Sequence, residues 1–265
     1  MKIGYLGPIG SYSYEAALKY RSDNDQIIEY QTISKVVSAI EIDEIDIAIL
    51  PFENAIYGSV VDTMDGILKN RDLYINDEII IDINHKLMAK NSDEEILKVY
   101  SHPQAIAQCQ KYLEEKLPNA DIIKVSSTSM GASIASSEKN TACICNGACQ
   151  KIYNLVVIDD NIQEIKENQT RFIVVSKMKR VKENANKTSI IFETKNRPGA
   201  LYKILGLFSL TDINLTKIES RPARTRLGDY MFFVDIEGSI ESENIRKVLE
   251  FVEEYCQNFR ILGSY

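Results

Sequence analysis

Short apolar runs alternate with helix-like patterns of apolar residues over the first 175 residues of the chain. The runs predict strands at 2–6, 45–50, 96–100, 121–125, 141–145 and 155–158, and the patterns predict helices at 13–21, 103–117 and 129–137. Such alternation is typical of parallel sheets that are covered by helices and bind ligands outside the carboxyl ends of their strands. At 73–89, two strand-like runs instead surround Asn84 and His85. We therefore expect two α/β lobes joined by a crossover here, with a return near Val157.

A different order follows the polar segment 176–187, which holds five lysine or arginine residues. Strand, helix, strand, strand, helix and strand patterns succeed one another, and both helices carry apolar residues at i, i+3, i+4 and i+7, beginning at Leu201 and Ile245. This βαββαβ order predicts a ferredoxin-like module, which is regulatory or ligand-binding more often than catalytic. The predicted fold class is α/β: a first part of 1–180, whose lobes are 1–76 with 157–180 and 77–156, followed by a module of 187–265.

The composition is that of an ordinary globular protein, with 45% hydrophobic and 26% charged residues. A net charge of −7 and the lack of a basic stripe argue against a nucleic-acid partner, and no apolar run is long enough for a membrane helix. The five cysteines, an odd number, indicate a reducing cytosol. Cys143, Cys145 and Cys149 lack a structural zinc spacing and a nearby histidine, so we interpret them as packing residues and expect no metal.

Thr170 and Arg171 stand where the polar run 161–169 meets the apolar strand 173–175. A hydroxyl and a guanidinium at such a junction can present a hydrogen-bond donor and a fixed cation to one small anionic ligand. The alternative is a turn cap beside a solvated charge, and spacing alone favours that alternative.

Two predicted helix starts are rich in small hydroxyl residues, 7–13 with Ser11 and 126–129 with Thr128. Each follows a strand, so its free backbone N–H groups and the positive end of the helix dipole would face the crevice. The lysine of a phosphate loop is absent, and a carboxylate is the anion that suits this arrangement. Ordinary N-capping is an equally good explanation of each segment.

Polar side chains also follow two buried strands. Glu53 and Asn54 come after the strand at 45–50, and Ser101 comes after the strand at 96–100, with Gln108 on the next helix. Converging amide, hydroxyl and carboxyl groups predict a binding cleft at the carboxyl ends of these strands. We interpret His102 as a helix-start residue and His85 as a satisfied, partly buried histidine.

Several of these segments form longer motifs in a fixed order. The first part of the chain contains Gly7-Pro8, Pro51-Phe52-Glu53-Asn54, Ser101-His102-Pro103-Gln104, Ser127-Thr128 and Asn168-Gln169-Thr170-Arg171-Phe172. The second part contains Arg197-Pro198-Gly199-Ala200-Leu201, Glu219-Ser220-Arg221-Pro222 and Leu227-Gly228-Asp229-Tyr230. With these motifs the chain resembles prephenate dehydratases with a carboxy-terminal ACT domain, over nearly its full length. It departs from them at Tyr12, Ala55 and Tyr202, where Phe, Ser and Val are usual.

The resemblance implies two catalytic lobes similar to those of periplasmic binding proteins. It also implies conversion of prephenate to phenylpyruvate, with loss of CO₂ and water, in L-phenylalanine biosynthesis without any cofactor. Thr170 would be the catalytic hydroxyl, and Glu53 or water the possible proton donor. The residues that would bind substrate are Ser11, Asn54, Ser101, Gln108, Thr128 and Arg171.

For the ACT domain, the resemblance implies that L-phenylalanine acts as an allosteric effector. The residues that would bind it are Gly199, Ala200, Leu201, Glu219, Ser220, Arg221 and Pro222. Effector sites between modules of two chains imply a homodimer or homotetramer in the cytoplasm, with no nucleic-acid or membrane partner. Two alternatives stay open: an arogenate dehydratase, and a non-catalytic amino-acid sensor, for which Ala55 is the only support in the sequence.

Overall fold

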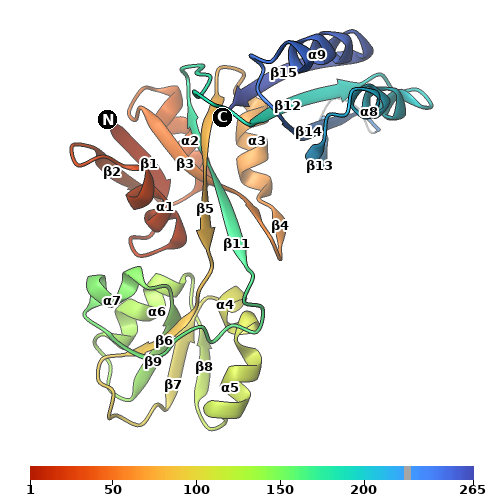
Figure 1. The fold of residues 1–265 in the computed structure, drawn as a ribbon. Helices are drawn as coiled ribbons and strands as arrows, with labels where there is room; N and C mark the ends of the chain where they lie inside the picture. The colour runs from red at the N-terminus through yellow and green to blue at the C-terminus, as the bar shows by residue number, and fades with distance from the viewer. Residues whose placement is uncertain (224–227) are drawn as a thin grey trace. The chain divides into compact units, whose positions relative to one another are not determined.

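The apolar runs of the first lobe form the centre of a six-stranded sheet. In the computed structural model, which describes residues 1–223 and 228–265, its strand order is β2-β1-β3-β11-β5, with β4 beside β3 (Figure 1). The strands are β1 (Lys2–Leu6), β2 (Gln26–Tyr30), β3 (Ile47–Asn54), β4 (Gly58–Ser59), β5 (Tyr74–Asp82) and β11 (Gln169–Ser176). Leu227, one of the motif residues above, lies outside the described residues.

Burial explains why this lobe folds around β3. Ala48, Ile49 and Leu50 of that strand have no exposed surface, as expected for a central strand covered on both faces. The strand β1 runs parallel to both β2 and β3. The lobe's helices are α1 (Tyr12–Tyr20), α2 (Ile33–Glu41) and α3 (Val61–Lys69). In α2 the apolar residues at i, i+3, i+4 and i+7, starting at Ile33, are buried, so one helix face covers the sheet.

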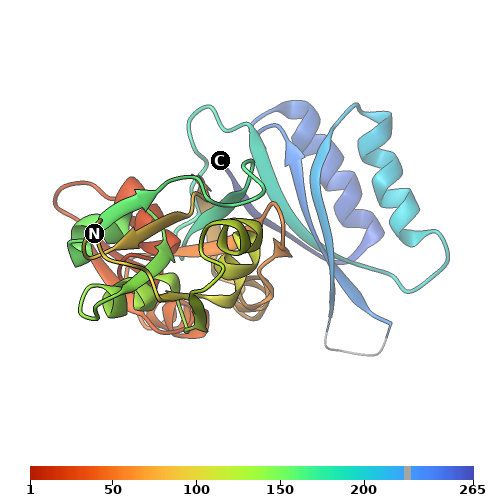
Figure 2. The ribbon, with the colours of Figure 1, turned by 90° about the horizontal axis from the view of Figure 1, so that it is seen from below.

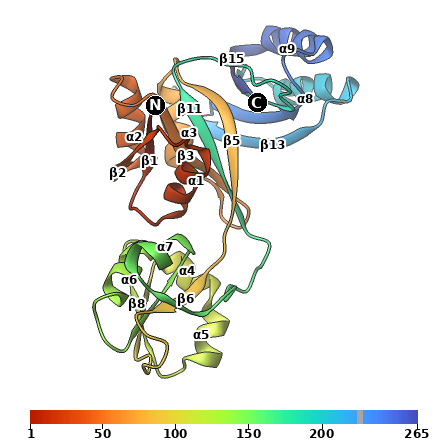
Figure 3. The same cartoon turned by 60° about the vertical axis from the view of Figure 1, so that its left-hand side comes forward.

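Two neighbouring strands, β5 and β11, lead from this sheet to the second lobe (Figures 1 and 3). The outgoing connection is the predicted one at Asn84 and His85, and the backbone N–H of Ile83 donates to the carbonyl of Asn168 at 2.8 Å, which ties the two connections together. The return predicted near Val157 lies after Asp159 instead, because the strand that contains Val157 pairs within the second sheet.

The second lobe has a five-stranded sheet of order β10-β6-β9-β7-β8. Its strands are β6 (Lys86–Ala89), β7 (Lys98–Ser101), β8 (Asp121–Lys124), β9 (Thr141–Cys145) and β10 (Val156–Asp159). The prediction of parallel sheets is correct for β7 with β8 and β9 but wrong for β6 and β10, which pair antiparallel. The strand β6 enters directly from the crossover without an intervening helix, so the usual parallel crossover geometry does not apply to it.

Four helices belong to the second lobe: α4 (Pro103–Gln108), α5 (Gln110–Lys116), α6 (Thr128–Ala135) and α7 (Ala148–Tyr153). The single helix predicted at 103–117 is divided at Cys109, whose backbone leaves the helical region at φ −116° and ψ 16°. Helix α6 lies very close to β7, because a Cβ atom on Gly131 would stand 2.7 Å from the carbonyl oxygen of Tyr100. This close approach fixes the start of α6 relative to the sheet.

The cysteines of the second lobe are core residues. Cys143, Cys145 and Cys149 have no exposed surface and pack with Met88 and Leu155. The thiols of Cys143 and Cys145 are 3.5 Å apart, and all five cysteines of the chain are free. Burial of these thiols confirms the packing interpretation.

The carboxy-terminal module has the predicted βαββαβ order and a four-stranded antiparallel sheet of order β13-β14-β12-β15. Its elements are β12 (Lys187–Thr194), α8 (Ala200–Leu210), β13 (Leu215–Pro222), β14 (Tyr230–Glu237), α9 (Glu243–Tyr255) and β15 (Cys256–Ser264). The two helices lie side by side along the sheet (Figure 2). Their predicted apolar residues, except Leu205, pack with Ile190, Phe192 and Val234 of the sheet, so the predicted fold class is confirmed.

The structure divides by its contacts into two compact units, Met1–Leu68 with Ile79–Phe172 and Lys69–Glu78 with Ile173–Tyr265. Within the second unit, Arg260 donates from its guanidinium to the carbonyls of Asn70 and Leu73 at 3.2 and 2.6 Å. Residues 69–78 therefore belong with the module by their contacts, while the division into 1–180 and 187–265 stays a prediction. Among the described helices, none combines the length and apolar character needed to cross a membrane.

Candidate active site

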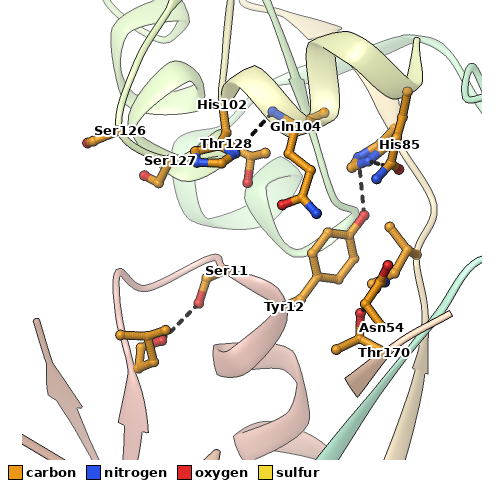
Figure 4. A pocket seen from close by; sticks show the side chains of 14 residues that line it. Ser11, Tyr12, Asn54, His85, His102, Gln104, Ser126, Ser127, Thr128 and Thr170 are labelled. Atoms are coloured by element: carbon orange, nitrogen blue, oxygen red, sulfur yellow. Dashed lines mark hydrogen bonds between the residues drawn. The ribbon is translucent and has the colours of Figure 1, made fainter. Parts of the chain in front are cut away.

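A cavity of about 290 Å³ lies within the first unit, where the two lobes face each other (Figure 4). The first lobe contributes Leu6, Ser11, Tyr12, Asn54 and Thr170, and the outgoing crossover contributes Ile83 and His85. The second lobe contributes His102, Gln104, Ala105, Gln108, Ser126, Ser127 and Thr128. This volume is at the lower end of the range for small-molecule sites.

Thr170 and Asn54 come together at the ends of two neighbouring strands. Asn54 is the last residue of β3, and Thr170 is the second residue of β11, which lies beside β3 in the sheet. The amide Nδ2 of Asn54 donates to Thr170 Oγ1 at 2.9 Å. Because Thr170 Oγ1 accepts this bond, its own proton can be donated elsewhere, and no residue in the described part of the chain accepts it.

Asn168 connects this pair to the second lobe. Its Oδ1 accepts from Asn54 Nδ2 at 2.9 Å, and its Nδ2 donates to Gln108 Oε1 at 3.1 Å. The side chain of Asn168 is almost completely buried. The three carboxamides thus form a continuous chain from β3 to α4.

His85 lies at the far end of this chain. Its Nε2 is 3.0 Å from Gln108 Oε1, its backbone N–H donates to Gln163 Oε1 at 2.9 Å, and the Tyr12 hydroxyl is 3.4 Å from its Nδ1. Desolvation lowers the pKa of His85 to about 4, with the bond to Gln108 partly offsetting that effect, so the ring is neutral at pH 7. The interpretation of His85 as a satisfied histidine is confirmed, and its ring also forms part of the cavity wall.

The opposite wall consists of helix starts. Ser127 Oγ accepts from the backbone N–H of Met130 at 3.0 Å and caps α6, and His102 Nδ1 accepts from the backbone N–H of Gln104 at 3.2 Å and caps α4. Ser11 caps α1 from the first lobe in the same way, through the backbone N–H of Tyr14. The positive ends of α1 and α6 therefore lie at the cavity and favour an anion.

Formal charge is absent from the cavity lining. None of the fourteen lining residues, all in the described part of the chain, is Asp, Glu, Lys or Arg. Neutral amides, hydroxyls, imidazoles and helix ends thus supply the whole polar surface that a ligand would meet.

Arg171 and Glu53 lie beside the cavity rather than in its lining. Arg171 Nη1 is 3.7 Å from Glu53 Oε2, and the guanidinium lies 5.2 Å from the centre of the Phe52 ring. Because β11 already begins at Gln169, Thr170 and Arg171 are successive strand residues whose side chains point to opposite faces. The expectation that both side chains meet one ligand therefore does not fit the geometry.

Ser101 is also outside the cavity lining. It has no exposed surface, and its hydroxyl donates to the carbonyl of Ile144 on the neighbouring strand at 2.6 Å. The structure thus gives Ser101 a bond within the second sheet instead of a place in the wall.

A model of the prephenate dehydratase family matches residues 3–180, and a model of the ACT domain matches residues 188–254. The chain belongs to the prephenate dehydratase family. Enzymes of this family are lyases of phenylalanine biosynthesis. The resemblance seen in the sequence motifs is therefore confirmed.

Named relatives align over the whole chain. The bifunctional chorismate mutase/prephenate dehydratase of Aquifex aeolicus is 40% identical over 266 residues, which cover 100% of this chain and 73% of the relative. The prephenate dehydratase of Lactococcus lactis subsp. cremoris is 36% identical over 275 residues, which cover 100% of this chain and 97% of the relative. Among solved structures, prephenate dehydratase from Arthrobacter aurescens in complex with L-Phe aligns with a TM-score of 0.91 and 30% identity, covering 100% of this chain and 90% of that one.

The structure brings together five of the residues predicted for the prephenate dehydratase site: Ser11, Asn54, Gln108, Thr128 and Thr170. It adds lining residues that were not predicted as site residues, among them Tyr12, His85, His102 and Ser127. Asn168 was also not predicted as a site residue, although it lies two residues before Thr170, because its hydrogen-bond partners are distant in the sequence.

The residues predicted to bind an effector gather at one end of the ACT sheet. Gly199 is the N-cap of α8 and has φ +75°, and β13 ends at Pro222, which pairs with Tyr230 at the start of β14. Asn196 of the α8 approach and Gly228 are close, since a Cβ atom on Gly228 would stand 3.5 Å from the Asn196 amide. Both predicted segments thus border the same end of the module, beside the edge strand β13.

Proposed function

We propose that the protein converts prephenate into phenylpyruvate with loss of CO₂ and water, and that Thr170 donates a hydrogen bond to the departing ring oxygen. The observation that carries this proposal is the bond from Asn54 Nδ2 to Thr170 Oγ1. It makes the threonine oxygen an acceptor and leaves the hydroxyl proton for a ligand in the cavity.

The proposed reaction requires the protein to hold prephenate in place and to stabilise the departing ring oxygen. The bond between the ring and its carboxylate breaks to release CO₂, the electron pair enters the ring, and the bond to the ring oxygen breaks as the ring becomes aromatic. The departing oxygen gains negative charge, which a hydrogen bond from Thr170 stabilises in the transition state. A threonine hydroxyl is too weak an acid to supply the proton that completes water, so the proton comes from solvent. The ion pair of Glu53 with Arg171 gives no support to Glu53 as the donor.

The helix starts suit the carboxylates of this substrate. Ser11 and Thr128 line the cavity at the amino-terminal ends of α1 and α6, where backbone N–H groups lack helical partners. Each such end stabilises an anion by roughly 0.3–1 kcal/mol, and more when partly buried. We assign binding to these ends and turnover to Thr170.

The cavity lining favours prephenate over arogenate. Arogenate differs by carrying an ammonium group on its side chain, and a desolvated ammonium requires an anionic partner. Among the fourteen lining residues, which the structure describes in full, none is acidic. A keto substrate therefore fits this lining better than the aminated one.

Regulation by L-phenylalanine at the ACT module is part of the proposal, as are assembly into a homodimer or homotetramer and a cytosolic location. The prephenate dehydratase from Arthrobacter aurescens, whose structure was solved in complex with L-Phe, supports L-phenylalanine as the effector. The clustering of Gly199 and Pro222 at one end of the sheet supports a single site, and the edge strand β13 offers a surface for a second chain.

The test of the activity is a product assay of the purified protein. We expect phenylpyruvate from prephenate and little phenylalanine from arogenate, with Thr170→Ala as the control for a contaminating enzyme. Product from arogenate alone would overturn the substrate assignment. Absence of product from both, with retained binding of phenylalanine by calorimetry, would favour an amino-acid sensor.

The test of regulation compares two glycines of the module. Gly199 adopts φ +75°, so Gly199→Ala strains the N-cap of α8, whereas Gly206→Ala lies within the helix and meets no atom within 4 Å. We expect Gly199→Ala to raise the phenylalanine concentration for half-maximal effect and Gly206→Ala to leave it unchanged, with uninhibited turnover equal in both. An allosteric coupling is typically 1–3 kcal/mol, which sets the size of the shift. Equal responses of the two variants would contradict the assignment.

A further inference from the structure

The oxygen and nitrogen atoms of the Asn54, Asn168 and Gln108 side chains can be assigned from their hydrogen bonds, because backbone N–H groups fix the orientation of Asn54. Asn54 Oδ1 accepts from the backbone N–H groups of Ile56 and Tyr57, each at 3.0 Å. A backbone N–H can only donate, so this atom of Asn54 must be the oxygen. The nitrogen of the Asn54 amide therefore faces Asn168 and Thr170.

The orientation passes from one side chain to the next. Since Asn54 Nδ2 donates, the atom of Asn168 at 2.9 Å must be its oxygen, and the nitrogen of Asn168 then faces Gln108. The atom of Gln108 at 3.1 Å from Asn168 Nδ2 must accordingly be Oε1. A flipped Gln108 would place two N–H donors against each other.

The last link determines the state of His85. Gln108 Oε1 only accepts, so the His85 nitrogen at 3.0 Å, Nε2, must carry a proton. A neutral imidazole has one N–H, which leaves Nδ1 bare. The Tyr12 hydroxyl, which donates to the carbonyl oxygen of Asn84 at 2.9 Å, lies 3.4 Å from that bare nitrogen.

We propose that these hydrogen bonds, which run from the Ile56 and Tyr57 amides on one side and from His85 on the other and meet at Gln108 Oε1, make His85 a positioning residue that holds Gln108 for the dehydratase reaction proposed above. With Gln108 Oε1 occupied from two sides, its NH₂ group is the part that meets a ligand in the cavity. No residue in the described ranges accepts from that NH₂ group. His85 thus acts through Gln108 and does not itself contact the reacting atoms.

The first test reads the tautomer directly and does not depend on activity. The chain has two histidines, so isotope-labelled histidine gives a simple nitrogen NMR spectrum, and His85→Gln assigns the signals. We expect Nε2 of His85 to be protonated and Nδ1 bare at neutral pH in the full-length protein. Tyr12→Phe should leave this tautomer unchanged. Asn54→Asp cannot donate to Asn168, so the orientations of Asn168 and Gln108 are no longer fixed, and we expect a mixture of the two His85 tautomers. A protonated Nδ1 in the parent protein would overturn the proposal.

The second test separates positioning from packing. His85→Gln retains a side-chain N–H that can reach Gln108, whereas His85→Leu fills the buried space but cannot donate. We expect His85→Leu to lower kcat roughly tenfold, the loss of about one hydrogen bond's effect, with little change in KM and with His85→Gln recovering most of the rate. A packing role predicts the opposite ranking, because leucine tolerates burial better than glutamine.

These outcomes distinguish the inference from the function on which it rests. If the parent protein produces no phenylpyruvate while the predicted tautomer is observed, the proposed function fails and the hydrogen-bond chain stands. If the parent protein is active and His85→Leu is as active as His85→Gln, the positioning role fails and the dehydratase assignment stands.

Discussion

The two walls of the cavity are built in different ways. In the first-lobe wall, Asn54 bonds to Asn168 and Thr170, which are 114 and 116 positions away in the sequence. In the second-lobe wall, Ser127 and His102 bond to backbone N–H groups only three and two positions away. The first wall depends on the assembled tertiary structure, whereas the second requires only the first turn of a helix.

This difference corresponds to different demands of the proposed reaction. One departing oxygen needs a donor at a defined point, and a side chain held by several others provides it. A carboxylate can instead be bound by the broader positive potential of a helix end, which tolerates small displacements. Changes at Asn54 and Thr170 should therefore lower turnover, and changes at the helix starts should mainly weaken substrate binding.

The largest effect is expected for Thr170. Replacing it with alanine removes the hydroxyl that receives a bond from Asn54, and we expect kcat to fall roughly 10²- to 10³-fold with little change in KM. Thr170→Ser keeps the hydroxyl and should retain much more activity. Steady-state kinetics with prephenate measure both variants, and a Thr170→Ala enzyme within a few-fold of the parent would falsify the assigned role.

Asn54→Asp tests the direction of the hydrogen bond between Asn54 and Thr170. An aspartate at this position can still accept from the Ile56 and Tyr57 amides, so the local turn is preserved. It cannot donate to Thr170, and the threonine hydroxyl would then donate to the carboxylate instead of the substrate. We expect kcat to fall on the order of 10²-fold. Circular dichroism and thermal denaturation should show a folded protein; if turnover were also normal, the direction of the Asn54–Thr170 bond would be wrong.

Local features of the site could be predicted from the sequence. The hydroxyl-rich helix starts at 7–13 and 126–129 follow from capping, which involves residues a few positions apart. The crossover at His85 follows from two strand-like runs without a helix between them. These signals lie within single segments of the chain, so one sequence contains enough information to find them.

Features that depend on strand phase or on distant partners could not be predicted. Ser101 ends a strand as expected, but a one-residue change of phase decides whether a strand side chain faces the crevice or the sheet, and its hydroxyl bonds to Ile144. The same alternation separates Arg171 from Thr170. Asn168 and His85 are both hydrogen-bonded to Gln108, 60 and 23 positions away.

His85, at the junction of the two walls, should make stability depend on pH. Its pKa is about 4 in the folded protein against about 6.5 in an unfolded chain, so below pH 6.5 the unfolded state binds more protons. Stability from this residue is complete above about pH 6.5 and is lost as the pH falls towards 4. At pH 5 the loss should be about 2 kcal/mol relative to pH 7.

Urea denaturation of the parent and of His85→Gln at these two pH values measures the difference, because the other titrating groups are common to both proteins. The parent should lose about 2 kcal/mol more than the variant. Equal losses would show that His85 is not buried in its neutral form.

The smallest effect is expected in the second wall, at Ser127. Ser127→Ala removes the cap of α6 and should cost about 1 kcal/mol of stability, with a rise in KM of a few-fold. Ser127→Asp keeps a capping oxygen but places a negative charge where a substrate carboxylate is expected. We therefore expect the aspartate variant to be as stable as the parent and to have the higher KM of the two, while kcat changes little in either.

Thermal denaturation and initial rates over a range of prephenate concentrations test this ranking. If KM followed stability instead, so that the alanine variant bound prephenate worse than the aspartate variant, Ser127 would serve the helix alone and the carboxylate would lie elsewhere in the cavity.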